Sequence, residues 1–151
     1  MPIKVAAPIM IAIAIVVVIL LSFATSPSIT AMDATNNELV ARGKVLYAAN
    51  CATDCHGANL EGQPNWRKPL EEGGLPAPPH DETGHTWHHD DALLFKYTKM
   101  GGAAIAPPGF QSRMPGFGET LSDEEIWAVL SYIKSTWPLE AQRRQEQRNK
   151  N

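Results

Sequence analysis

The stretch NCATDCHG, residues 50–57, contains both cysteines of the 151-residue chain. Cys51 and Cys55 are separated by three residues, and His56 follows the second cysteine directly. Residues four apart lie on the same side of a helical turn, so both thiols are expected on one edge of a turn. Two thiols and an imidazole in so short a segment indicate a site for a metal or for a group that contains one.

Three simpler sites explain this motif incompletely. Zinc needs four ligands and the motif offers three, so a histidine from another segment would have to complete the site. A disulfide between Cys51 and Cys55 would close a very small loop, stabilise little and leave His56 without a role. A thioredoxin-like redox pair requires a βαβ context, which this sequence does not predict.

Covalent haem attachment uses all three residues. Each thiol forms a thioether with the porphyrin, and the histidine after the second cysteine ligates the iron. The usual spacing is C-x-x-C-H, whereas Cys51, Cys55 and His56 give C-x-x-x-C-H. Both thiols can still reach the porphyrin if the backbone bulges to absorb the additional residue.

Three segments have apolar residues at helical spacings: residues 38–50, 91–100 and 122–137. Each begins near a candidate capping residue: Asn36 or Asn37, Asp90 or Asp91, and Ser122. Gly43 lies on the apolar face of the first helix, where it would let another helix approach closely. No strand pattern of useful length accompanies these helices, so we expect an all-α domain.

Two long segments between the helices, residues 62–79 and 103–118, are rich in glycine and proline. Long loops are uncommon inside a small domain unless they serve a function. We therefore expect them to wrap a large cofactor that replaces part of the core.

Four stretches in this order resemble small class I c-type cytochromes of bacteria: ARGKVLYAAN, NCATDCHGANLEG, RMPGF and LSDEEIWAVLSYIKSTWP. The resemblance covers residues 39–138 and implies a cytochrome c-like fold of three or more helices around one covalent haem c. It implies that Cys51 and Cys55 form the thioether bonds and that His56 is the proximal iron ligand. It also implies that the first and last helices cross through a glycine and an aromatic contact, for which Gly43, Tyr47, Trp127 and Tyr132 are available.

In that family the distal iron ligand is a methionine followed by proline. Met114 precedes Pro115 in the second long loop, whereas Met100 ends the middle helix and is more typical of packing, so Met114 is the expected ligand. Trp87 is a candidate donor to a haem propionate through its indole N–H. The remaining histidines are predicted to be solvated loop residues, and a role of His80 or His85 at the iron or a propionate stays open.

The N-terminal segment differs in composition from the rest of the chain. Residues 1–24 contain an apolar run that is intermediate between a signal peptide, with its core of roughly 7 to 15 residues, and a membrane-spanning helix of about 20. We expect either a signal peptide or a membrane anchor there, then a flexible linker over 25–37, the domain over 38–138 and a polar tail over 139–151. The domain would then lie on the periplasmic side of a bacterial inner membrane.

These features predict an electron carrier that cycles between Fe(II) and Fe(III) in a respiratory or dehydrogenase-linked chain. Redox proteins would dock weakly and transiently, and nucleic acid is not an expected partner because the net charge is −3 and no continuous basic stripe occurs. Three alternatives stay open: a copper-handling module with sulfur ligands, a haem enzyme with an open sixth site, and the cytochrome subunit of a larger dehydrogenase.

Overall fold

The structure is a computed structural model that describes residues 28–150. Its elements are all helical: α2 (Asn37–Tyr47), the π-helix η1 (Ala48–His56), the 3₁₀ turn η2 (Thr86–His88), α3 (Asp91–Met100), α4 (Gly102–Ile105), α5 (Asp123–Ser135) and α6 (Leu139–Arg148). The expected all-α class is confirmed. The predicted membrane-directed segment lies outside the described residues, and within 28–150 none of the helices has the length and apolar character needed to cross a bilayer.

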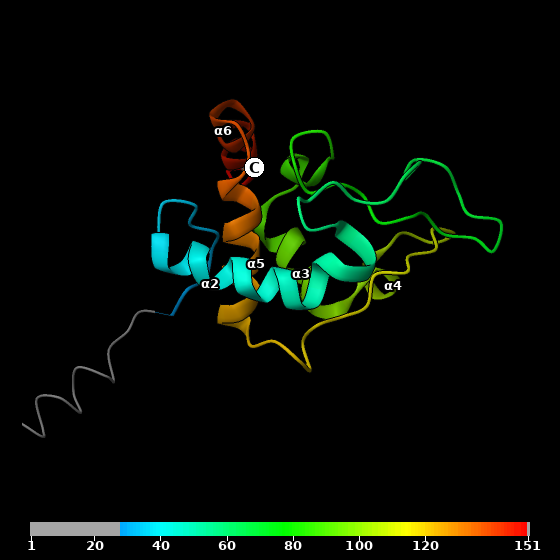
Figure 1. The fold of residues 1–151 in the computed structure, drawn as a ribbon, viewed down its shortest axis with the longest axis horizontal. Helices are drawn as coiled ribbons and strands as arrows, with labels where there is room; N and C mark the ends of the chain where they lie inside the picture. The colour runs from blue at the N-terminus through cyan, green and yellow to red at the C-terminus, as the bar shows by residue number, and fades with distance from the viewer. Residues whose placement is uncertain (1–27, 151) are drawn as a thin grey trace, which may run out of the picture.

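Helices α2 and α5 cross each other and form the centre of the domain (Figure 1). Gly43 is buried at this crossing, where a side chain would collide with the backbone of Ala128. One turn further along α2, the ring of Tyr47 lies 5.4 Å from that of Tyr132. Trp127 instead stacks on Phe95 of α3, with ring centroids 4.4 Å apart. The predicted glycine and aromatic crossing is therefore present, with Tyr132 as the aromatic partner from α5.

The helix starts follow the predicted capping residues. The side chain of Asn36 accepts a hydrogen bond from the Leu39 N–H at 3.1 Å, and that of Asp90 accepts one from the Leu93 N–H at 2.8 Å. Ser122 begins α5 with a complete capping box. Beyond Pro138 the tail continues as helix α6.

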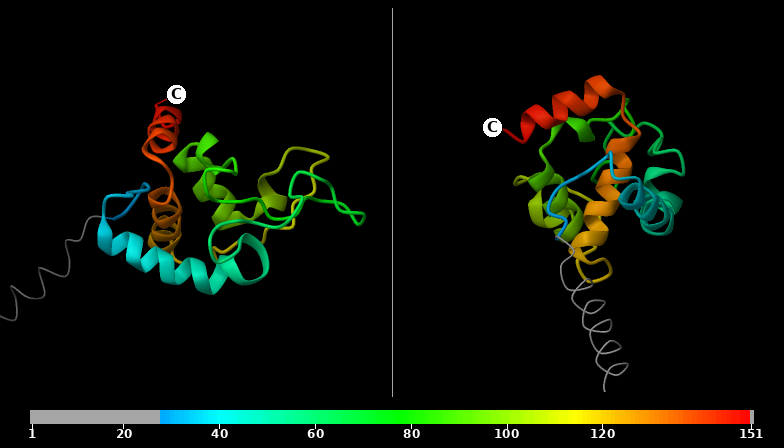
Figure 2. Two further views of the ribbon diagram at one scale, coloured as in Figure 1. Left: turned by 45° about the horizontal axis from the view of Figure 1, so that its top comes forward. Right: turned by 90° about the vertical axis from the view of Figure 1, so that its left-hand side faces the viewer.

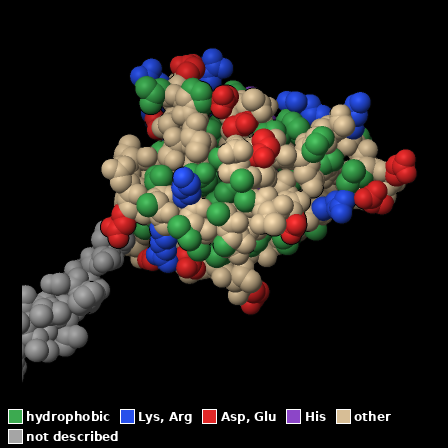
Figure 3. Space-filling view, viewed as in Figure 1, with side chains coloured by type: hydrophobic (Ala, Val, Ile, Leu, Met, Phe, Trp, Pro, Cys, Tyr) green, Lys and Arg blue, Asp and Glu red, His purple; other side chains and the backbone are tan. Residues whose placement is uncertain are grey.

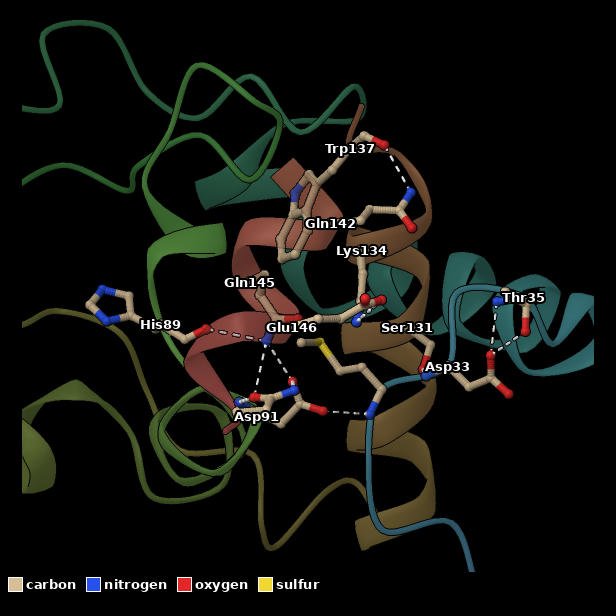
Figure 4. A network of polar contacts seen from close by, with 12 residues as sticks. Asp33, Thr35, His89, Asp91, Ser131, Lys134, Trp137, Gln142, Gln145 and Glu146 are labelled. Carbon is tan, nitrogen blue, oxygen red and sulfur yellow. Dashed lines mark hydrogen bonds and ion pairs between the residues drawn. The ribbon is translucent and has the colours of Figure 1, made fainter. Parts of the chain in front are cut away.

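Part of the segment expected to be a linker packs on the domain (Figure 4). Met32 is 7% exposed and belongs to the core. Its N–H donates to the Asp91 carboxylate at 3.1 Å, and the next N–H, from Asp33, donates to the Ser131 hydroxyl at 2.9 Å. Asp91 also accepts hydrogen bonds from Gln145 and Asn149 of α6. One carboxylate at the start of α3 thus joins the N-terminal segment to the C-terminal helix.

The two long loops extend together, away from the end of the molecule where α2 begins (Figure 2). Arg113 of the second loop forms an ion pair with Glu72 of the first at 3.1 Å. At Gly73, where φ is +90°, a side chain would collide with Gln111. The loops are therefore in contact with each other near their far ends.

Candidate functional site

Both cysteines lie on the π-helix η1, which continues directly from α2. A π-helix closes i→i+5 hydrogen bonds, and π-bulges in α-helices are frequent at functional sites. The bond from the Gly57 N–H to the Ala52 carbonyl, 3.0 Å long, has this span. Tyr47 fixes the end of the same turn, because its hydroxyl donates to the Gly57 carbonyl at 3.0 Å.

This π-helix explains the wider spacing of the thiols. In an α-turn the hydrogen bond spans four residues, and thiols three apart fall just short of one turn. In the π-turn the bond spans five residues, so Cys51 and Cys55, four apart, again fall just short of one turn. The expected bulge is therefore a π-turn, which accommodates the additional residue between Cys51 and Cys55 and keeps both thiols on the same side of the turn.

Neither thiol forms a disulfide. Cys55 is exposed and Cys51 is half-buried. Burial raises the pKa of the Cys51 thiol to about 11, and the nearby Cys55 adds to this shift. Both sulfur atoms are thus free to form thioether bonds.

His56 ends the π-turn and is 7% exposed. Its ring Nδ1 lies 2.8 Å from the Pro78 carbonyl, which can only accept, so Nδ1 carries the proton. Burial lowers the pKa of His56 and the bond to Pro78 raises it, with burial the larger effect. The ring is therefore neutral at neutral pH, with its Nε2 lone pair available to a metal, and the motif fits a haem.

A second histidine lies against this ring. His80 stacks on His56 with ring centroids 3.9 Å apart and an angle of 27° between the planes. Burial lowers the pKa of His80 well below its usual value, and the neighbouring His56 adds to this effect. From the sequence, His80 is predicted to be a solvated loop histidine, with a role at the iron or a propionate left open. No local motif indicates its contact with His56, which is 24 positions earlier in the chain.

Met114 is half-buried in the second long loop. Its carbonyl accepts a hydrogen bond from the Gly102 N–H at 3.0 Å. The loop comes so close to the end of α3 that a side chain at Gly116 would lie 2.7 Å from the Met100 carbonyl carbon. Met100 itself is 52% exposed. The position of Met114 is thus fixed by backbone contacts, and its role as iron ligand stays a prediction.

The other loop histidines and tryptophans pair with one another. His85 stacks on Trp66 with centroids 5.5 Å apart, and His88 lies 3.7 Å from Trp87. The indole N–H of Trp87 donates to the Glu82 carbonyl at 3.3 Å. A contact between Trp87 and a haem propionate stays a prediction, and it would require this N–H to exchange its partner.

Over residues 28–150, no group of three or more His, Cys, Asp or Glu side chains is arranged to hold a metal ion. Haem attachment does not require such a group, because the two thiols bond to the porphyrin and only the histidine bonds to the metal.

An all-α fold with two free thiols on one turn, followed by a buried neutral histidine, fits the class of proteins that carry a covalently attached haem. The family model described as Cytochrome c matches residues 40–137, more than half of the chain. The chain therefore belongs to the cytochrome c family, binds one haem c covalently and functions in electron transfer. No significant match is found among curated proteins or solved structures.

Proposed function

We propose that the protein is an exported single-haem electron carrier in which His56 and Met114 occupy the two axial positions of the iron. The cysteines of the π-turn are the attachment points, and the chain serves a respiratory or dehydrogenase-linked pathway. When bound, haem c supplies an iron that alternates between Fe(II) and Fe(III).

The observation that carries this proposal is the hydrogen bond from His56 Nδ1 to the Pro78 carbonyl. A metal-binding histidine usually donates its other ring N–H in this way, which fixes the tautomer and raises the basicity of the ligating nitrogen. Because the same residue ends the turn that bears both thiols, its Nε2 and the two sulfur atoms belong to one continuous helical segment.

Met114 is the candidate for the opposite side. Pro115 restricts Met114 towards an extended backbone, and the hydrogen bond from the Gly102 N–H holds the loop at the start of α4. A thioether is a neutral, soft ligand that favours the ferrous state and raises the potential. With His56 and Met114 in place no coordination site is open to a substrate, which is the condition for an electron carrier.

Partners are expected to bind weakly, because a carrier must dissociate after each transfer. On the face shown in Figure 3, charges of both signs are interspersed with hydrophobic side chains. Such a surface favours short-lived docking more than a permanent complex. If residues 1–24 are retained as an anchor, they raise the local concentration of the carrier near membrane-bound partners.

Carbon monoxide tests this proposal. The reduced protein at neutral pH should keep its low-spin spectrum in the presence of the gas, because Met114 holds the sixth position. A shift of the Soret band on addition of carbon monoxide would contradict His/Met ligation and favour a haem enzyme with an open site.

A further inference from the structure

We propose that His80 is a positioning residue for the iron ligand His56: its stacked imidazole fixes the plane of the ligand ring. This inference rests on the proposed role of His56 as the proximal ligand. It concerns how the chain orients the His56 ring. The ligand role of His56 and the positioning role of His80 can therefore be disproved separately.

The hydrogen bond to Pro78 leaves the ring plane of His56 incompletely determined. The torsion that turns a histidine ring about its Cβ–Cγ bond has broad minima. A carbonyl oxygen also accepts hydrogen bonds over a broad range of directions. The bond of 2.8 Å therefore places Nδ1, and a contact with the face of the ring is needed to define the plane.

His80 provides that contact. Its ring lies 3.9 Å from the His56 ring, at 27° to it. Tyr47 approaches His80 edge-on, with centroids 6.4 Å apart. A rotation of His56 out of its plane would therefore drive one of its edges into the His80 ring.

His80 can support another ring because it is itself held at several points. Its Nδ1 is hydrogen-bonded to the Thr86 hydroxyl at 2.8 Å, and Thr86 is buried. Its carbonyl accepts the indole N–H of Trp137 at 2.7 Å, and its N–H donates to the Leu60 carbonyl at 2.8 Å. These bonds connect His80 to the segment between α5 and α6 and to the turn that follows the cysteine motif.

The bond to Thr86 gives the His80 ring a defined orientation. An apolar residue such as leucine would fill the volume beside His56 but would present no flat ring with an orientation set by a hydrogen bond. A residue that fixes a plane needs its own orientation defined. The Thr86 hydroxyl defines the orientation of His80.

The consequence for the ligand concerns its donor strength. A large rotation of His56 carries Nδ1 beyond the range of directions over which the Pro78 carbonyl accepts, so the hydrogen bond weakens. A weaker bond makes the ligating nitrogen less basic. A less basic ligand stabilises the ferric state less, so the reduction potential should rise.

The test uses the full-length haem-loaded protein and the variants His80→Leu, His80→Phe and Thr86→Val. Three quantities are measured: the haem-methyl NMR shifts of the ferric protein, which report the plane of the axial imidazole, the solvent-exchange rate of the His56 Nδ1 proton, and the reduction potential. His80→Leu should change the methyl-shift pattern, speed proton exchange several-fold and raise the potential. His80→Phe, which keeps a flat ring, should give values closer to those of the wild type than His80→Leu does. Thr86→Val should give values between those of the two His80 variants.

His88→Leu is the matched control, because His88 is an exposed histidine of the same loop that contacts Trp87. It should leave all three quantities unchanged. Wild-type values in both His80→Leu and Thr86→Val would overturn the inference, as would equal effects of leucine and phenylalanine. If His80→Leu fails to retain haem, Thr86→Val and His80→Phe decide the question.

These outcomes are separate from a failure of the proposed ligation. If His56 does not bind the iron, the wild-type protein itself lacks the NMR and optical signature of an imidazole ligand. A normal wild-type signature that no His80 or Thr86 variant alters rejects only the role of His80.

Discussion

Gly43 of α2 lies directly against the backbone carbonyl of Ala128 in α5, with no room between them for a side chain. A Cβ atom at Gly43 would also come within 3.0 Å of the Tyr132 Cβ. The helix crossing that supports the cysteine-bearing turn therefore depends on a residue with no side chain.

Gly43→Ala should destabilise the fold. The added methyl group meets backbone, which cannot move aside as a flexible side chain can, so we expect a loss of about 1–3 kcal/mol in the free energy of unfolding. Chemical denaturation of the haem-loaded protein measures it. Ala41→Ser, an exposed change in the same helix, should stay within about 0.5 kcal/mol of the wild type. Equal stability of Gly43→Ala and the wild type would show that the helices can separate at no cost.

Deletion of Asp54 should convert the π-turn into an α-turn and preserve attachment of the haem. The deletion restores C-x-x-C-H spacing, and in either turn the thiols fall just short of one revolution. Mass spectrometry and the pyridine haemochrome spectrum measure haem content and the number of thioether bonds. Asp54→Ala, which keeps the wider spacing, is the control and should load normally. Loss of haem in the deletion alone would mean that the wider turn has a purpose of its own.

The two thiols of the haem-free chain should differ in reactivity. The exposed Cys55 should be alkylated first at pH 8, because burial holds the pKa of Cys51 at about 11 and leaves little thiolate. The alkylation rate of Cys51 should rise as the pH approaches 11. Peptide mapping by mass spectrometry follows both sites, circular dichroism confirms that the sample is helical, and the denatured chain should show no such difference.

The same shift has a consequence for the stability of the haem-free chain, in which Cys51 carries a free thiol. The pKa of Cys51 is raised in the fold above its ordinary value of 9.0, so the unfolded chain releases the proton at lower pH. Its contribution to stability is complete below pH 9 and is lost as the pH rises to about 11. Cys51→Ala should therefore lose less stability over this interval than the wild type.

Met114→Ala should remove the methionine-to-iron charge-transfer band at the red end of the ferric spectrum. Met100→Ala should keep it, since the Met100 side chain is half-exposed at the end of α3. Both variants remove a methionine, so a difference between them reports ligation and not general loss of sulfur. Persistence of the band in Met114→Ala would assign the sixth ligand to another residue.

Local interactions account for what the sequence predicts well. The caps of α2, α3 and α5 are hydrogen bonds that span three residues, so the residue types at those positions are sufficient to indicate them. The thiols and His56 occupy six consecutive residues, and their chemistry follows from that spacing. Gly43 was predictable because a glycine on an apolar helix face indicates the close approach of a second helix.

Interactions between distant segments account for what it misses. Nothing in the segment around His80 indicates a stack on His56. The N–H of the buried Met32 donates to Asp91, and Asp91 also accepts from Gln145, so these contacts join three segments that are distant in the sequence. Considered one at a time in the sequence, Met32, Asp91 and Gln145 are residue types expected in a linker, a helix cap and a polar tail.

The mass of the native protein tests the central claim most directly. Protein isolated from cells that attach haem to exported proteins should weigh one haem more than its amino acids, and the added mass should stay with the chain after denaturation. The same spectrum shows whether residues 1–24 are retained. A mass equal to that of the amino acids alone, without Soret absorption, would contradict the account.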